Sequence, residues 1–280
     1  MVNKSLIVNG MQKSLSMIAL IVLLLIMVSP FAMITFNAFK TEAELYANGP
    51  LRLPQSLNFQ NLVETWTRLD YPTKLWNSLV ISTAVAFLAV GVSLFNAYAL
   101  GIGKVKGKAF FLVFFILAVT LPHETLAYPL YYFFKRVGLY NTRLAVILIF
   151  TVLHSSYGTY LLTSVFGVFS RELIDAAMID GCNKVQLLFR IVVPLNIPSL
   201  SVLFVFFFIW TWNEFFLPLI FLVSNAKQTI PLATAMFQTQ HGTFLTMQSA
   251  SAFLGVLPCI IFFVLFQRTL TKGITVGSTR

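Results

Sequence analysis

The residues best suited to bind a polar solute lie at 210–214, where Trp-Thr-Trp-Asn-Glu interrupts a long apolar stretch. A carboxylate at membrane depth is costly unless it is paired or hydrated, which makes Glu214 a candidate for function. Indole faces together with amide or carboxylate groups can hold a sugar ring, which is apolar on its C–H faces and polar around its edge. Trp210, Trp212, Asn213 and Glu214 are therefore predicted to line a solute pathway. The alternative is that the indoles pack against a neighbouring subunit and that Glu214 gates or braces its helix.

The position of this segment along its helix bears on that choice. If the helix begins near Ser199, a rise of ~1.5 Å per residue carries Glu214 past the middle of a membrane and into its outer half. Helical spacing would place Trp210 and Leu217 on the same face as Glu214, and Pro218 would kink the helix just beyond them. We therefore expect a polar face in the outer half of this span.

The remaining groups that could do chemistry are scattered. Glu124 lies between Pro122 and Pro129 near the outer boundary of a predicted span, where a carboxylate reaches water by snorkelling. No metal site or disulfide is predicted from the isolated His123, His154, His241, Cys182 and Cys259. No Cys/His pair, His/Asp/Glu cluster or serine-containing elbow indicates an enzyme, so we expect no catalytic residue in this chain.

The elements that carry these residues are predicted to be membrane helices. Hydrophobic residues make up 58% of the 280 residues and charged residues only 10%, far from the composition of soluble proteins. The apolar runs are continuous rather than alternating, which favours helices of ~20 residues over a β-barrel. The predicted spans are 14–39, 75–100, 109–134, 144–167, 198–223 and 246–267. The expected fold class is all-α integral membrane, as one domain over residues 1–280.

Charge along the chain indicates how these spans are oriented. The formal net charge is +10, but the basic residues are scattered among loops, which fits an anionic lipid surface better than a nucleic acid. The compact loop with Lys104, Lys106 and Lys108 favours a cytoplasmic side that also holds both termini, whereas the basic loop at 135–143 favours the opposite orientation. The first run is too long for a secretory signal and lacks a small-residue cleavage site. We predict a retained first span, cytoplasmic termini and an outer segment at 40–74.

The most informative connection is the predicted cytoplasmic loop at 170–194. Ser170 is expected to cap a short helix, and Gly181 supplies the left-handed residue that commonly follows a helix end. A second helical stretch follows and is expected to end at Pro194. The small residues at 176–177 would let another protein approach the first helix closely. The alternative is an amphipathic helix that lies on the membrane surface.

Two runs in this loop resemble the EAA loop of ABC importer permeases, in the form found in the carbohydrate-uptake branch typified by the maltose system. These runs are Asp175-Ala176-Ala177-Met178-Ile179-Asp180-Gly181-Cys182 and Phe189-Arg190-Ile191-Val192-Val193-Pro194-Leu195. Asp175 stands where the family usually has Glu, which keeps the charge, and Cys182 replaces a common Ala.

Other pieces of the chain match the family pattern in order and place, so that the resemblance covers nearly the whole length. They are Asn77-Ser78, Ala97-Tyr98-Ala99-Leu100, Gly138-Leu139-Tyr140-Asn141-Thr142, Trp212-Asn213-Glu214-Phe215 with Pro218-Leu219, and Gln267-Arg268 with Gly273-Ile274-Thr275. The C-terminal tail departs from the family ending, which is rich in Gly and Lys.

The resemblance implies a type I permease fold with six spans and a cytoplasmic coupling helix, in the inner membrane of a bacterium. It implies four kinds of partner: a second homologous permease, two ATPase subunits, an extracytoplasmic solute-binding protein and a sugar. The residues that would contact the ATPase are Glu172, Asp175, Ala176, Ala177, Asp180, Gly181, Phe189 and Pro194. ATP and Mg²⁺ would be bound by the partner chain, because this sequence has no Gly-x-x-x-x-Gly-Lys-[Ser/Thr] phosphate loop.

The main alternative is a secondary transporter or channel that is driven by an ion gradient. Such a protein would be expected to carry more intramembrane charges or broken-helix pairs than Glu124 and Glu214 provide. An integral membrane enzyme is a second alternative, and no cluster of catalytic residues supports it.

Overall fold

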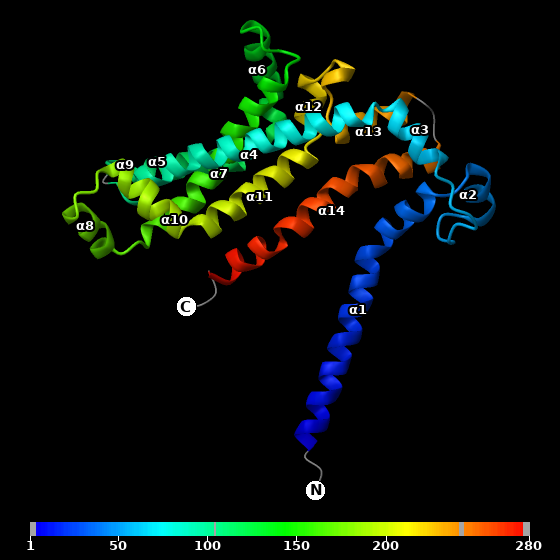
Figure 1. Cartoon of the computed structure of the whole chain (residues 1–280), viewed down its shortest axis with the longest axis horizontal. Coiled ribbons are helices and arrows are strands. Elements are labelled where there is room, and N and C mark those ends of the chain that lie inside the picture. Colours follow the sequence, from blue (N-terminus) through cyan, green and yellow to red (C-terminus); the bar gives the residue numbers. More distant parts are fainter. Residues whose placement is uncertain (1–3, 104, 241–243, 277–280) are drawn as a thin grey trace. The chain divides into compact units, whose positions relative to one another are not determined.

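The computed structural model describes residues 4–103, 105–240 and 244–276 (Figure 1). Every regular element in these ranges is helical, which confirms the predicted all-α fold class. The chain forms two compact units, the smaller comprising Met1–Leu69 with Met236–Leu257 and the larger comprising Asp70–Ala235 with Pro258–Arg280. Two helices run from one unit into the other, so the division does not fall at a linker. The single domain predicted over 1–280 stays a prediction.

The larger unit holds most of the helices. Its elements are α4 (Tyr71–Gly101), α5 (Lys108–Thr120), α6 (His123–Arg136), α7 (Arg143–Gly167), α8 (Arg171–Ile179), α9 (Lys184–Leu187), the π-helical turn η1 (Leu188–Val192), α10 (Val193–Leu195), α11 (Ile197–Asn213), α12 (Phe216–Phe221) and the 3₁₀ turn η2 (Asn225–Lys227). The smaller unit holds α1 (Lys4–Ala38), α2 (Glu42–Asn48) and α3 (Gln60–Arg68). The helices α13 (Ile230–Gln240) and α14 (Leu245–Val276) belong to both units.

Several helices are long and apolar enough to cross a membrane. In the described part of the chain they are Lys13–Ala38, Tyr71–Gly101, Arg143–Gly167 and Leu245–Gln267, and two bent helix pairs raise the number from four to six if each pair is one span. The residues that lie within the bilayer stay predicted from hydropathy.

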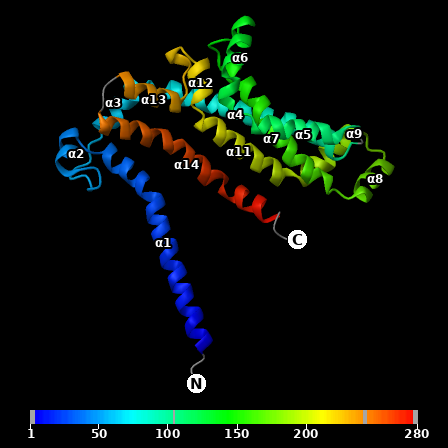
Figure 2. The same cartoon turned by 180° about the vertical axis from the view of Figure 1, so that it is seen from behind.

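The core of the larger unit is the contact between α4 and α7, which lie side by side in both views (Figures 1 and 2). Small residues allow this close approach: Ser93 Oγ on α4 donates to the carbonyl of Ser155 on α7 over 3.2 Å. A Cβ on Gly158 would clash with Ser93 and would lie 2.9 Å from Phe207 Cζ on α11. Gly158 is therefore the point where three helices meet, as small residues allow in membrane bundles.

The third predicted span is broken at a proline. The axes of α5 and α6 differ by 96° across the break at Leu121 and Pro122. Leu121 has an extended backbone (ψ 126°), the conformation that a following proline favours. Continuous helix over 109–134 would also have lost one backbone hydrogen bond at Pro122.

The fifth predicted span breaks at a different residue from the one expected. We predicted continuous helix through Glu214 with a kink just beyond it, but α11 ends at Asn213 and Glu214 is extended (ψ 132°). Pro218 has no N–H to donate to the carbonyl of Glu214, four residues earlier, and its ring would collide with that carbonyl in a helix. Pro218 therefore ends the helix about one turn before its own position in the chain. Glu214 and Leu217 consequently do not share a helix face.

The smaller unit is held together by a buried lysine. The Nζ of Lys40 donates to Asn37 Oδ1 at 2.9 Å and to the carbonyl of Gly49 at 3.0 Å. Glu42 Oε1 accepts from both the backbone N–H and the hydroxyl of Thr246 at 2.8 Å, which caps the start of α14. These bonds fix the segment after α1, where the sequence predicted an outer connection.

A matched pair of glycine substitutions tests the contact between α4 and α7. Gly158→Ala is expected to destabilise the protein by ~1–3 kcal/mol, because the added methyl group overpacks the site against Ser93 and Phe207. Gly91→Ala is the control, since a Cβ on Gly91 in α4 would meet nothing within 4 Å. Thermal unfolding of the detergent-solubilised protein measures both. Equal melting temperatures for the two variants would show that the close approach is absent.

Candidate functional site

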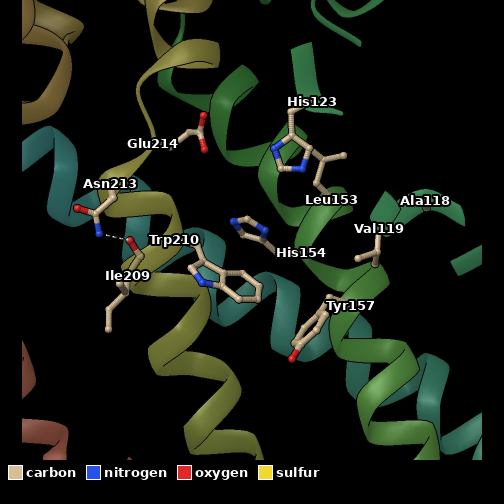
Figure 3. A pocket seen from close by; sticks show the side chains of 10 residues that line it. All are labelled: Ala118, Val119, His123, Leu153, His154, Tyr157, Ile209, Trp210, Asn213 and Glu214. Carbon is tan, nitrogen blue, oxygen red and sulfur yellow. Dashed lines mark hydrogen bonds between the residues drawn. The ribbon is translucent and has the colours of Figure 1, made fainter. Parts of the chain in front are cut away.

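The larger unit contains an open cavity of about 480 Å³ near the end of α11. Its lining residues come from four helices and the break after α11, and are Ala118, Val119, His123, Leu153, His154, Tyr157, Ile209, Trp210, Asn213 and Glu214 (Figure 3). A cavity of this volume, lined by a mixture of aromatic and polar side chains, is typical of small-molecule sites. The end of α11 that carries these residues lies away from α8 (Figure 1).

Trp210 forms the aromatic wall of the cavity. It is 40% exposed and meets Tyr157 edge to face, with 5.2 Å between ring centroids. Phe206 stacks on it from the same helix at 5.9 Å. The packing fixes the indole in one orientation and leaves part of its surface open.

His154 was predicted to have no ligand role, yet it lies at the floor of the cavity. Its ring stacks between Phe150 at 5.5 Å and Phe207 at 5.4 Å. Its Nε2 lies 3.1 Å from Thr211 Oγ1, and the residue is only 6% exposed. These contacts hold the imidazole rigidly. Figure 3 shows it between Trp210 and His123.

The sequence did not predict that His123, His154 and Tyr157 line the cavity, because each is isolated in the chain. His154 and Tyr157 are three residues apart on α7, but this helix also carries Thr151, Ser155, Ser156 and Thr159, so their spacing does not stand out in the sequence. His123 is the first residue of α6 and follows the break at Pro122. Helical periodicity does not continue through such a break, so it cannot predict which way His123 faces. Only the packing of α5, α6, α7 and α11 brings these side chains together.

The four residues predicted to line a solute pathway do not all do so. Trp212 is 2% exposed and stacks on Phe208, so it lies within the packed core rather than the cavity. Asn213 lines the cavity, but its amide turns back to the carbonyl of Ile209 at 2.8 Å. Of the four, Trp210, Asn213 and Glu214 line the cavity. Figure 3 shows the Glu214 carboxylate on the side of the cavity where His123 lies.

The segment that follows Glu214 is anchored to the start of α4. The Nζ of Lys74, which is 1% exposed, donates to the carbonyl oxygen and to the side-chain oxygen of Asn225, at 2.7 and 2.6 Å. The amide of Asn77 donates to the carbonyls of Ala226 and Gln228, each at 2.9 Å. Buried backbone carbonyl groups need hydrogen-bond partners, and these two side chains supply them. We name the contacts of Lys74 and Asn77 with 225–228 the return-turn clamp.

The start of α7 extends the return-turn clamp. Arg143 donates to Asn77 Oδ1 at 3.0 Å, and the amide of Asn141 donates to Ser224 Oγ at 2.6 Å. Lys227 Nζ donates to the carbonyl of Asn141, also at 2.6 Å. The Asn77-Ser78 and Gly138–Thr142 pieces of the sequence, far apart in the chain, thus meet around one turn.

The predicted loop at 170–194 begins with a capped helix. Ser170 Oγ accepts from the backbone N–H of Leu173 at 3.2 Å, which confirms the predicted N-cap of α8. Gly181 has φ +85°, and the N–H of Cys182 donates to the carbonyl of Ala177 at 3.0 Å. These are the left-handed residue and the backbone bond of a Schellman motif. The helix is therefore closed at both ends without help from a partner.

The exposed surface of α8 differs from the prediction at one residue. Ala177 is 5% exposed and packs inside the loop, toward α9, whereas Ala176 is exposed. Ala177 is thus not available to a partner in this structure, because successive helical residues point about 100° apart. The predicted contact residues Glu172, Asp175, Asp180 and Gly181 are exposed. So are the apolar Met178 and Ile179, the latter 86%.

The second stretch of the loop does not end at Pro194 as predicted. After a capping box between Asn183 and Gln186, the backbone passes through α9 and η1 and reaches Leu195 in α10. Pro194 is tolerated because it lies in the first turn of α10, where its missing N–H costs no bond. Phe189 is half exposed on η1, and Pro194 is exposed as well.

Comparison with known proteins identifies the class. Residues 97–276 match the family described as binding-protein-dependent transport system inner membrane component. The chain belongs to this family, and the resemblance to ABC importer permeases seen in the sequence is confirmed.

Individual relatives cover almost the whole chain. The sulfoquinovosyl glycerol transport system permease protein SmoH of Agrobacterium fabrum is 32% identical, over 96% of this chain and 94% of the relative. The arabinooligosaccharides transport system permease protein AraQ of Halalkalibacterium halodurans is 31% identical, over 91% and 92%. The trehalose/maltose transport system permease protein MalG of Thermococcus litoralis is 27% identical, over 96% and 98%.

The fold is also similar to that of a solved structure. A chain in the crystal structure of a bacterial ABC transporter involved in the import of the acidic polysaccharide alginate matches with a TM-score of 0.79, at 18% identity, over 96% of this chain and 98% of that one. The predicted type I permease architecture is therefore supported over the whole chain.

Loss of the lysine from the return-turn clamp should loosen the turn. Lys74→Met is expected to speed amide hydrogen exchange at Lys227 and Gln228 by about tenfold to a hundredfold, because hydrogen bonds from a charged donor contribute ~1.5–3 kcal/mol. Lys135→Met is the matched control, since Lys135 is exposed and bonds only to Tyr131 in the described structure. Unchanged exchange in Lys74→Met would show that the clamp does not hold the turn.

Proposed function

We propose that this chain is a permease subunit of an ATP-driven sugar importer. It forms half of a translocation pathway with a second homologous permease and couples to one of two ATPase subunits through the loop at 170–194. A solute-binding protein delivers the sugar from outside. The chain lies in the inner membrane with both termini in the cytoplasm, and ATP and Mg²⁺ are held by the ATPase and not by this chain.

The observation that carries this proposal is the form of α8. It is a short helix, capped at both ends, whose exposed surface combines acidic residues with Met178 and Ile179. A stiff element of this kind transmits the motion of a partner, whereas a flexible loop would absorb it. Alternating access by such rigid-body motion is common among transporters.

The charge of α8 favours a protein partner over the membrane surface. Its sequence through Asp180 has one basic residue, Arg171, against the acidic Glu172, Asp175 and Asp180. An anionic lipid surface would repel this helix, while amphipathic surface helices carry basic residues on their polar face. The exposed Ile179 then needs a partner that covers it. A socket on an ATPase subunit meets both requirements.

The cavity supports a sugar as the solute. An open indole face at Trp210, the phenol of Tyr157 and the carboxylate of Glu214 surround a space of about 480 Å³, which accommodates a small saccharide. The relatives are named for saccharides and a sugar derivative, including arabinooligosaccharides and trehalose/maltose. The ion-driven carrier considered from the sequence has no such support.

Crosslinking tests the docking of α8. In a background with Cys182→Ser and Cys259→Ala, a benzophenone maleimide attached at Ala176→Cys is expected to crosslink to the co-purified ATPase subunit on illumination. Ala177→Cys is the matched control and is expected to react poorly, because this position is buried. Absence of a crosslink from position 176 in an assembled complex would contradict the proposed docking surface.

Substitution of Trp210 tests the pathway. Trp210→Ala is expected to lower ATP-dependent uptake by about threefold to tenfold, because aromatic contacts contribute ~0.5–1.5 kcal/mol beyond buried area. Trp210→Phe keeps an aromatic face and should retain most of the uptake. The measurement uses proteoliposomes with the solute-binding protein and labelled maltose, trehalose and arabinooligosaccharides. Full uptake by Trp210→Ala at equal protein abundance would place the solute elsewhere.

A further inference from the structure

The loop at 170–194 touches the membrane helices at a specific point on α4. The hydroxyl of Tyr98 donates to the carbonyl of Lys184 over 2.8 Å. One helical turn earlier on α4, the ring of Phe95 meets the ring of Phe189 edge to face, with centroids 6.3 Å apart. Both views show α9 beside this end of α4 (Figures 1 and 2). Two contacts therefore join the second stretch of the loop to one helix.

Both partners of the Tyr98 bond are rigid. Lys184 is the first residue of α9, directly after the capping-box residue Asn183, so its carbonyl is fixed by the helix. On the other side, α4 ends at Gly101, where an added Cβ would lie 2.7 Å from Phe166 Cβ on α7. A bond between two such elements transmits displacement better than a bond between flexible loops.

A continuous set of contacts leads from this point to the cavity. On α4, Ser93 bonds to the carbonyl of Ser155 on α7 and lies against Gly158. His154 is the neighbour of Ser155 and stacks on Phe207 of α11. A movement of α4 would therefore shift the residues that form the floor of the cavity.

We propose that Tyr98 is a positioning residue that ties the loop at 170–194, here called the docking loop, to α4. Displacement of this loop by the ATPase is then passed to α7 and α11, which line the cavity. This inference rests on the proposed function. The exposed α8 hands its motion to α9 through the turn at Gly181, and the Tyr98 hydroxyl carries it from α9 to α4. Without that hydroxyl, the loop can move while α4 lags behind.

The experiment compares Tyr98→Phe with Tyr160→Phe in the assembled transporter, in a background with Cys182→Ser, Cys259→Ala and the cavity residue Val119→Cys. Tyr160 is an exposed tyrosine on α7 and serves as the matched control. The measurement is the rate at which a membrane-impermeant maleimide labels position 119, with and without ATP and vanadate. Thermal unfolding and the amount of bound ATPase are measured on the same samples.

In the background protein, ATP with vanadate is expected to change the labelling rate. Tyr98→Phe should reduce that change by about threefold to tenfold, the effect expected for loss of one hydrogen bond, at unchanged melting temperature and ATPase binding. Tyr160→Phe should respond like the background. An unchanged response in Tyr98→Phe, or a loss accompanied by lower thermal stability, would overturn the role of Tyr98. No response to ATP in the background would instead refute the proposed function itself.

Discussion

Pro218 cannot donate a hydrogen bond to the carbonyl of Glu214, and this missing bond determines where α11 ends. The helix stops at Asn213, and Glu214 is turned out of it toward the cavity. After α12 the chain turns at 225–228, and the carbonyl groups of this turn need hydrogen-bond partners. Lys74 and Asn77 supply them. A single imino acid thus ends α11 and places the carboxylate at the cavity.

The return-turn clamp joins pieces of the sequence that lie far apart in the chain. Asn77 and Asn141 lie in different predicted elements and contact neither the docking loop nor the open part of the cavity. Their role is to satisfy backbone groups around the turn at 224–228.

Much of the local structure could be predicted from the sequence. Composition and continuous apolar runs predicted the all-helical fold, and Ser170 and Gly181 predicted the ends of α8, because hydropathy and cap chemistry act over a few residues. The direction in which a side chain points could not be predicted in the same way. Of the two adjacent alanines at 176–177, the sequence could not tell which one faces a partner, since that depends on where α9 packs.

The sequence by itself determined that the chain is helical, apolar and interrupted at prolines, because these properties depend on residue type and near neighbours. It also identified Trp210 and Glu214 as polar exceptions in an apolar span. Only the tertiary structure decided that Trp212 is buried, that His154 joins Trp210 at the cavity, and that Tyr98 reaches the docking loop. Such contacts join residues tens of positions apart, and helix packing, rather than local preference, sets which side chains meet.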